Sequence, residues 1–303
     1  MFSFSFDIDE SELDQDLAQS AASLQQLDLA EDTKEASTSN SVPHSVLDLT
    51  ELIASLPPSI SYSPVTIKTS GKDISLLRRD LFDARFQVIS LQDEHGPDDN
   101  STSNDFKGKQ KETFVDKDTD LVKGVYEGGL KTWECSLDLV RVADEMAFGG
   151  TDGSVRGQSI IELGCGTALP SCSIFARLLS EIRRNPTDPE NVKPKKTRIH
   201  VQDYNKQVIS LITLPNILLT FAQHLTTPAN APDADEDAHV PSPGELEVTP
   251  QFLDMFQDLL NRENVELVFS EGDWADFVKQ GIDKYDVVLT SFKSMRHGVS
   301  GRK

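Results

Sequence analysis

The sequence has few cysteines, few basic side chains and no long apolar run, and each shortage excludes a class of protein. Its 303 residues include three cysteines, Cys135, Cys165 and Cys172, with no CxxC pair, and its six histidines are scattered. This distribution excludes a zinc or disulfide framework, predicts no metal site and favours a reducing intracellular compartment. No apolar run approaches ~20 residues, and the N-terminus lacks the pattern of a signal peptide, so we expect no membrane association.

The charge is strongly negative, because 29 basic residues stand against 50 acidic ones, giving a formal charge of −21. Residues 1–60 alone hold twelve acidic side chains and one lysine. Phosphate backbones repel such a protein, so the charge argues against direct nucleic-acid binding and suits a basic protein partner. Solubility alone is the alternative explanation of the charge.

Composition divides the chain into three parts. The hydrophobic content of 37% is low for a fully packed chain of this length. We expect residues 1–118 to be an acidic, mostly disordered N-terminal extension with short helical or strand segments. A folded domain is expected at residues 119–291, with polar insertions at about 183–197 and 225–249. A basic tail at residues 292–303 shows no strand or helix pattern.

Within residues 119–291, short apolar segments alternate with helical patterns. Leu130, Trp133, Leu137 and Val140 share one helical face, and a helix over residues 206–220 is expected to be interrupted by Pro215. The alternation predicts an α/β fold, with a Rossmann-like, doubly wound, mostly parallel sheet that is incomplete after its fourth strand. The expected strands cover residues 158–163, 198–201, 266–269 and 285–290.

The first of these strands ends in an acid followed by two glycines. Glu162 closes the apolar run, and Gly164 and Gly166 follow it. Glycines at this place let the backbone approach a ligand closely, and the start of the next helix offers free N–H groups. A dinucleotide-binding motif would have a third glycine at position 169, where Leu169 stands, so a pyrophosphate site is disfavoured.

Acidic residues also end the second and third strands. Asp203 can pair with ribose hydroxyls, since a carboxylate accepts two hydrogen bonds at once. Asp273 can accept from an adenine amino group, and the neighbouring Trp274 can stack on a purine. Together these residues predict a nucleoside-binding crevice at one edge of a parallel sheet. The alternative is that both acids are ordinary turn or cap residues.

Two longer motifs resemble known families. ELGCGTALP at residues 162–170 resembles the first motif of class I, seven-β-strand methyltransferases. GVYEGGLKTWECSLDL at residues 124–139 closely resembles the segment that precedes this motif in protein-histidine N-methyltransferases, a family that modifies ribosomal protein uL3. Further matches lie at residues 202–205, 213–216, 272–274 and 289–291.

The resemblance implies an S-adenosyl-L-methionine site. Trp133 would lie near the methionine end of the cofactor and Glu134 near its ammonium group, although Trp133 and Cys135 could instead be core residues. Asp203 with Tyr204 would hold the ribose, and Asp273 with Trp274 the adenine, while the catalytic residue stays unassigned. The complete set of residues implied to bind the cofactor is Thr132, Trp133, Glu134, Cys135, Ser136, Glu162, Gly164, Gly166, Gln202, Asp203, Tyr204, Asn205, Gly272, Asp273, Trp274 and Ser291.

The implied reaction is transfer of a methyl group to an imidazole nitrogen of uL3. A neutral imidazole, with a pKa near ~6.5, needs no strong base, so the enzyme mainly orients the ring. The resemblance also implies a location in the cytoplasm and nucleus. A basic cluster is compatible with nuclear import or with a solvated loop; it comprises Lys193, Lys195, Lys196 and Arg198.

The end of the chain departs from the family. Relatives continue after Leu-Thr-Ser with further strands, whereas here Ser291 is followed by FKSMRHGVSGRK. We therefore expect a truncated chain with weak cofactor binding and little activity. One alternative is a catalytically inactive binding protein, and another is a protein-lysine methyltransferase of the same fold. The NPPY-like motif of nucleic-acid amino-methyltransferases is absent at residues 289–291.

Overall fold

The structure is a computed structural model of the chain. It describes residues 42–71, 73–84, 87, 129–147, 153–187, 194–226, 241–280 and 284–290. Ser291, the expected tail and most of the residues expected to be disordered lie outside these ranges, as do residues 124–128 of the longer family motif.

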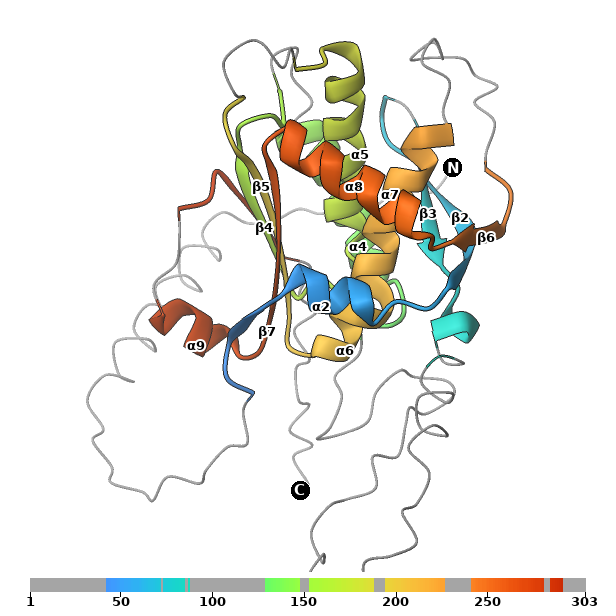
Figure 1. Cartoon of the computed structure of the whole chain (residues 1–303). Coiled ribbons are helices and arrows are strands. Elements are labelled where there is room, and N and C mark those ends of the chain that lie inside the picture. Colours follow the sequence, from blue (N-terminus) through green and yellow to red (C-terminus); the bar gives the residue numbers. More distant parts are fainter. Residues whose placement is uncertain are drawn as a thin grey trace, which may run out of the picture. The chain divides into compact units, whose positions relative to one another are not determined.

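A five-stranded sheet forms the centre of the fold (Figure 1). Its order is β1-β7-β5-β4-β8, in which β7, β5, β4 and β8 run parallel and β1 pairs antiparallel with β7. This arrangement confirms the predicted α/β class and the mostly parallel sheet. The strands are β1 (Ser45–Leu47), β4 (Ser159–Leu163), β5 (Thr197–Asp203), β7 (Val265–Glu271) and β8 (Val287–Thr290).

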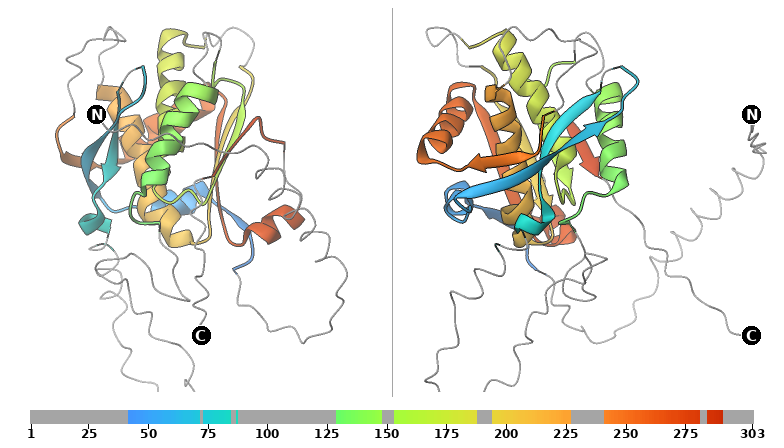
Figure 2. Two further views of the ribbon diagram at one scale, coloured as in Figure 1. Left: turned by 180° about the vertical axis from the view of Figure 1, so that it is seen from behind. Right: turned by 90° about the vertical axis from the view of Figure 1, so that its right-hand side faces the viewer.

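Helices lie on both faces of this sheet. In Figures 1 and 2, α4, α5, α7 and α8 lie on one face and α9 lies on the other. Phe277 of α9 contacts the ring of His200 in β5, with ring centroids 5.8 Å apart. The helices are α2 (Leu49–Ala54), α4 (Glu134–Val142), α5 (Leu169–Arg184), α6 (Lys206–Val208), α7 (Leu214–Thr226), α8 (Pro250–Arg262) and α9 (Trp274–Lys279), with π-helical turns η2 (Ala143–Ala147) and η3 (Ile209–Thr213).

The apolar faces of α5 and α8 match the periodicity of the sequence. The positions buried in α5 include Ile174, Leu178 and Leu179, and those in α8 include Phe252 and Phe256. Burying a side chain of this size contributes about 1.5–3 kcal/mol. These contacts fix the helix that begins directly after the glycine-rich segment.

Pro215 does not interrupt its helix, contrary to the prediction. The helix runs continuously over Lys206–Thr226, and its π-helical turn η3 lies just before the proline. Leu214 donates its N–H to the carbonyl of Ile209, and this wider turn accommodates a residue that has no N–H of its own. The helix is long and apolar enough to cross a membrane, but 72% of its most apolar window is buried inside the protein, as in a core helix.

The prediction of one helical face for Leu130, Trp133, Leu137 and Val140 was only partly correct. Helix α4 begins at Glu134, so Leu130 precedes the helix and Trp133 is its N-cap residue. Val140 is fully buried, whereas the Trp133 side chain is 39% exposed. The exposure of Trp133 also excludes its alternative interpretation as a core residue.

Strands also lie before residue 119, in the extension that was predicted to hold only short helical or strand segments. β1 extends the central sheet, and β2 (Ser59–Ile67) pairs with β3 (Ile74–Arg79) to form a hairpin. Ile60 and Leu77 of this hairpin pack against Leu219 of α7. These strands lie in the extension that was predicted to be mostly disordered, but their apolar residues are buried together.

The region expected to be a disordered insertion at about residues 225–249 also contains a strand. β6 (Gly244–Glu247) pairs antiparallel with β2, which gives a second sheet of order β3-β2-β6. Figure 2 shows this small sheet lying across the helices. Exposed acids at Glu245 and Glu247 alternate with the partly buried Leu246, whereas the prediction rested on the proline, alanine and acid content of the insertion.

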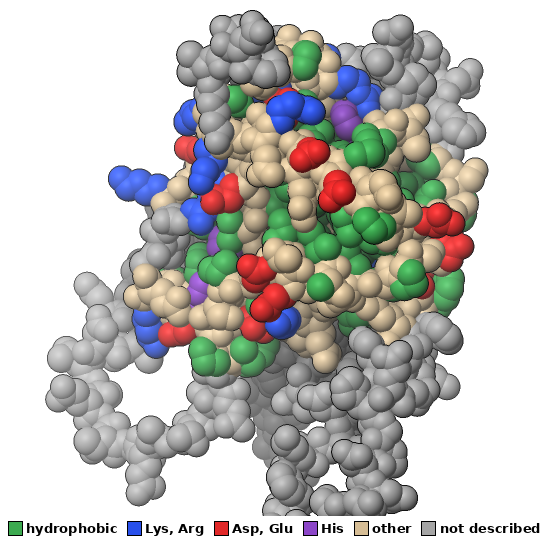
Figure 3. All heavy atoms as spheres, in the orientation of Figure 1, with side chains coloured by type: hydrophobic (Ala, Val, Ile, Leu, Met, Phe, Trp, Pro, Cys, Tyr) green, Lys and Arg blue, Asp and Glu red, His purple; other side chains and the backbone are tan. Residues whose placement is uncertain are grey.

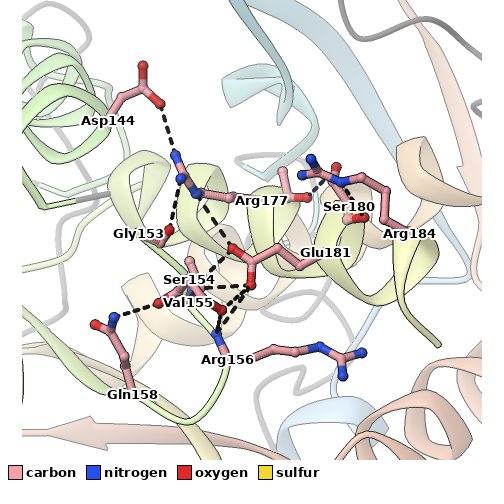
Figure 4. Close-up of polar contacts among 11 residues, drawn as sticks. Asp144, Gly153, Ser154, Val155, Arg156, Gln158, Arg177, Ser180, Glu181 and Arg184 are labelled. Carbon is pink, nitrogen blue, oxygen red and sulfur yellow. Dashed lines mark hydrogen bonds and ion pairs between the residues drawn. The ribbon is translucent and has the colours of Figure 1, made fainter. Parts of the chain in front are cut away.

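A polar network fixes the segment that leads into β4 (Figure 4). The carboxylate of Glu181 in α5 accepts hydrogen bonds from the Val155 N–H at 3.0 Å and from the Ser154 hydroxyl at 2.8 Å. Arg177, one turn earlier, donates to the carbonyl oxygen of Gly153 at 2.8 Å. Helix α5 is therefore tied to the segment that leads into β4.

Candidate functional site

The glycine-rich turn (residues 164–166) lies where β4 ends and connects to α5. Gly164 and Gly166 have φ values of +64° and +50°, in the left-handed region that glycine adopts without strain. A Cβ atom on Gly164 would lie 3.1 Å from the Trp274 indole, and one on Gly166 would lie 3.4 Å from the backbone of Gly129. The glycines therefore allow close approach of an aromatic ring and of a neighbouring loop.

The carboxylate of Glu162, at the end of β4, accepts hydrogen bonds from the first turn of α5. Its side chain is fully buried, and Oε2 accepts hydrogen bonds from the Ser171 N–H, at 2.9 Å, and from the Ser171 hydroxyl. The helix has no side-chain cap at Ala168, so Glu162 supplies the missing acceptor. Oε1 has no hydrogen-bond partner among the described residues. Burial, with a smaller contribution from the charge of Asp203, raises the pKa of Glu162 to about 7, although the hydrogen bonds from Ser171 oppose the shift.

Asp203 holds the glycine-rich turn from the neighbouring strand. Its Oδ2 accepts from the Gly166 N–H at 2.9 Å, and its Oδ1 accepts from the Asn205 N–H at 3.3 Å. Burial raises the pKa of Asp203 to about 6, although these hydrogen bonds oppose the shift. Asp203, which was predicted to contact a ribose, is only 8% exposed, and its carboxylate forms a hydrogen bond with the turn itself.

Gln202 orients the aromatic residue of the site. It is fully buried, and its Oε1 accepts from the Trp274 indole N–H at 2.6 Å. Its Nε2 donates to the carbonyl oxygen of Gly272 at 2.7 Å. Both polar atoms of Gln202 are therefore bonded to the protein, and its side chain fixes the Trp274 ring beside Gly164.

Asp273 acts as a helix cap, which is the alternative that the sequence left open. Its Oδ1 accepts from the N–H groups of Ala275 and Asp276, at 2.7 and 3.2 Å, at the start of α9. Asn205 similarly caps α6 by accepting from the Gln207 N–H at 2.9 Å. Both residues keep the ends of β5 and β7 in fixed turns.

A short segment, the strap (residues 42–44), crosses the ends of β5 and β7. The Val42 N–H donates to the Tyr204 hydroxyl at 3.1 Å, and the Val42 carbonyl accepts from the Asp273 N–H at 2.9 Å. Gly272 has a φ of +101°, and a Cβ there would lie 2.3 Å from the Pro43 carbonyl oxygen. The strap thus contacts three of the predicted site residues, and composition gave no sign of it.

The segment before α4 joins the site through hydroxyl groups. The Thr132 hydroxyl accepts from Arg78 at 3.2 Å and donates to the Thr167 hydroxyl at 3.4 Å. Cys135 is half-buried, and the Ser136 side chain is buried at the helix start. The structure therefore brings the start of this segment to the glycine-rich turn.

Trp133 and Glu134, at the start of α4, are exposed. No hydrogen bond from either side chain to the glycine-rich turn occurs among the described residues. The structure therefore does not join these two residues to the turn.

The polar residues of this region that were not predicted as site residues include Arg78, Arg79 and Asn216. Asn216 lies within a stretch matched to the family, but no role followed from that match. The burial of Arg79 could have been predicted from its position in the strand. Side chains alternate between the two faces of a strand, so Arg79 lies on the same side as the buried Leu77.

Curated relatives identify the family of the chain, although no family model matches it. The chain is 33% identical to histidine protein methyltransferase 1 of Saccharomyces cerevisiae over 202 residues, which is 66% of the chain and 48% of that protein. It is 30% identical to the Schizosaccharomyces pombe protein of the same name over 230 residues, 75% of the chain and 56% of that protein.

A homologue from Bos taurus is 30% identical over 179 residues, which is 57% of the chain and 38% of that protein. The chain thus spans about half the length of the two yeast relatives. The parallel sheet, the glycine-rich turn and these identities together place the chain in the histidine protein methyltransferase 1 family.

Proposed function

We propose that this chain binds S-adenosyl-L-methionine and directs its methyl group to a histidine of a protein substrate. The observation that carries the proposal is the glycine-rich turn at the carboxyl edge of the parallel sheet, with Trp274 on one side and Gly129 on the other. Ligands of open α/β sheets bind at this edge. The names of the relatives support the methyltransferase class and the histidine acceptor.

The residues present fit an adenosyl cofactor. Because Gly164 and Gly166 have no side chains, the backbone of the turn lies directly against the Trp274 ring and the Gly129 backbone, which we propose as walls of the cofactor site. Trp274 offers a partly exposed ring, and the Oε1 atom of Glu162 is a buried acceptor without a described partner. Two carboxyl groups, Glu162 and Asp203, lie beside the turn, and their ionised forms favour a positively charged ligand.

The cofactor supplies an activated methyl group on a sulfonium cation. The role of the protein is to fix the turn, to orient the Trp274 ring through Gln202 and to limit access of water. Gly164, Gly166 and Trp274 would hold the cofactor, which would supply its methyl group to a neutral imidazole of the substrate, and the methylated ring would release its N–H proton to solvent. No strong base is required for this step, because imidazole is already nucleophilic near neutral pH.

The proposed substrate is a basic protein, with ribosomal protein uL3 as the specific candidate. Exposed acids lie on α2, β6 and α8, and Figure 3 shows acidic side chains across the face that these elements present. They include Glu51, Glu245, Glu247, Asp254 and Asp258. Such a face attracts a positively charged protein and disfavours nucleic acid. We propose the cytoplasm and nucleus as the location on the family resemblance alone.

Calorimetric titration of the chain with S-adenosylhomocysteine tests the proposal. We expect binding with a Kd of about micromolar order and its loss in Gly164→Arg, because the new side chain would displace Trp274. Gly71→Arg is the matched control, since a Cβ at Gly71 meets no atom within 4 Å. Equal heats of binding for Gly164→Arg and Gly71→Arg, or no binding by the parent chain, would contradict the proposal.

A labelled cofactor then identifies the acceptor on uL3. Label on a histidine supports the proposed acceptor. Label on a lysine identifies a lysine methyltransferase of the same fold. Binding of cofactor and substrate without transfer identifies a non-catalytic binding protein.

A further inference from the structure

Asn216 joins the glycine-rich turn to a distant strand. Its side chain is fully buried in α7, and both ends of its amide form hydrogen bonds. Nδ2 donates to the carbonyl oxygen of Thr167 at 2.8 Å, directly after the turn. Oδ1 accepts from the N–H of Arg79, the last residue of β3, also at 2.8 Å. One amide therefore connects residues 49 and 137 positions away along the chain.

Arg79 is itself fixed on the other side. Its buried guanidinium donates through Nε to Asp83 at 2.7 Å and through an Nη atom to the carbonyl oxygen of Leu211 at 2.8 Å. A buried cation with these partners cannot shift without leaving a charge or a carbonyl unpaired. The end of β3 is therefore a rigid point from which Asn216 can be held.

A second chain of hydrogen bonds connects β3 to Thr167. Arg78 donates to the Thr132 hydroxyl, which in turn donates to the Thr167 hydroxyl. Thr167 is thus held at its backbone by Asn216 and at its side chain by Thr132. From η3, the Thr213 hydroxyl donates to the carbonyl oxygen of Gly166 at 2.7 Å. These bonds surround a turn whose two glycines would otherwise have wide conformational freedom.

We propose that Asn216 is a positioning residue through which β3 holds the glycine-rich turn in its ligand-binding conformation. The β2–β3 hairpin, which precedes every recognised motif in the sequence, is on this inference part of the framework of the site. The inference rests on the proposed function, because this turn is the proposed cofactor site. Loss of the amide leaves the Thr167 carbonyl and the Arg79 N–H buried and unpaired, which loosens the turn.

Hydrogen exchange in the full chain tests this role without any ligand. Asn216→Ser removes both hydrogen bonds of the amide. Gln223→Ala is the matched control, because Gln223 also lies in α7 and donates to a β3 carbonyl, that of Ser75 at 2.9 Å. That control weakens the same helix–strand contact at a site away from the turn. Exchange is followed by mass spectrometry in peptides that cover residues 163–169.

We expect the turn amides to exchange at least about ten-fold faster in Asn216→Ser than in the parent chain, and at the parent rate in Gln223→Ala. Unchanged exchange in Asn216→Ser, or equal acceleration in both variants, overturns the proposal. If the serine variant does not fold, Asn216→Asp is used, since it keeps the acceptor for Arg79 but loses the donor to Thr167. The same criteria then apply to that variant.

Affinity for S-adenosylhomocysteine provides the second measurement. We expect Asn216→Ser to bind at least about five-fold more weakly than Gln223→Ala, when each variant is measured equally far below its own melting temperature. Equal affinities overturn the positioning role. Absence of binding by the parent chain instead counts against the proposed function, and hydrogen exchange then decides the positioning role by itself.

Discussion

Two buried carboxyl groups of the candidate site have strongly raised pKa values. Burial raises the pKa of Glu162 to about 7 and that of Asp203 to about 6. Hydrogen bonds from Ser171 and from the Gly166 N–H oppose these shifts but do not cancel them. At neutral pH Glu162 is therefore close to the midpoint of its titration, whereas Asp203 is mostly ionised, and both groups lie beside the turn proposed to bind a cation.

Glu162→Gln gives a prediction about pH and stability. The folded pKa of Glu162 lies above its unfolded value of 4.5, so this residue stabilises the fold most at low pH, and that contribution is lost as pH rises from about 4.5 to about 7. The glutamine variant has no such loss. The stability of the variant relative to the parent should therefore rise by roughly 3 kcal/mol across this window.

Urea unfolding at several pH values measures this difference. All other titrating groups are shared by the two proteins, so they largely cancel in the comparison. Ser171→Ala is a useful control, because it removes the hydroxyl donor to Glu162 but leaves the carboxyl group in place. Parallel curves of stability against pH for parent and Glu162→Gln would show that Glu162 is not the group responsible.

At the scale of elements, the strap links the N-terminal strand β1 to the strand ends that form the site. The His44 N–H donates to Asp276 at 2.9 Å, and Gln280 donates to the His44 carbonyl at 3.0 Å. The His44 ring also packs on Phe277, with ring centroids 4.8 Å apart. Helix α9 and the strap thus hold one another, and the absence of a side chain at Gly272 allows the strap to pass.

Gly272→Ala should separate the strap from the site. The new Cβ would lie 2.3 Å from the Pro43 carbonyl oxygen, and the φ of +101° strains any residue other than glycine. We expect a loss of roughly 2–4 kcal/mol in stability, measured by urea unfolding, with faster hydrogen exchange in residues 42–47. Gly71→Ala is the control and should change little. Unchanged exchange in residues 42–47 would mean that the strap does not depend on this contact.

At the scale of the whole molecule, the N-terminal elements complete two sheets. β1 pairs with β7 in the central sheet, and β2 pairs with both β3 and β6 in the small sheet. The Ile67 and Leu76 side chains of this hairpin belong to the main hydrophobic core. Elements before residue 119 therefore cover surface that the later helices would otherwise expose.

A fragment of residues 119–303 should lose cooperative unfolding. It lacks β1, the hairpin and the residue that pairs with Asn216, so the apolar surface of α7 would face water. We expect a non-cooperative thermal transition by circular dichroism, with the complete chain as the control. A fragment that unfolds within a few degrees of the complete chain, as a single sharp transition, would contradict this account.

Sequence patterns with strong local periodicity predicted much of the fold. The four parallel strands and helices α5 and α8 were predicted from apolar runs and helical spacing, because the buried residues of each element lie within one short stretch of sequence. The glycine-rich turn followed from two glycines after an apolar strand. The hairpin β2–β3 and strand β6 did not follow, because short strands rich in serine or acid are stable only when paired with distant segments.

The amino-acid sequence by itself determined the class of the fold and the family, and it predicted a candidate site at the ends of the strands. Only the tertiary structure decided which polar atoms are engaged: Gln202 orients Trp274, Asp273 caps a helix, and Asp203 holds the Gly166 N–H. The physical reason is distance along the chain. A local pattern fixes the direction of one helix or strand, but the partner of a buried polar group belongs to another element, and packing alone selects it.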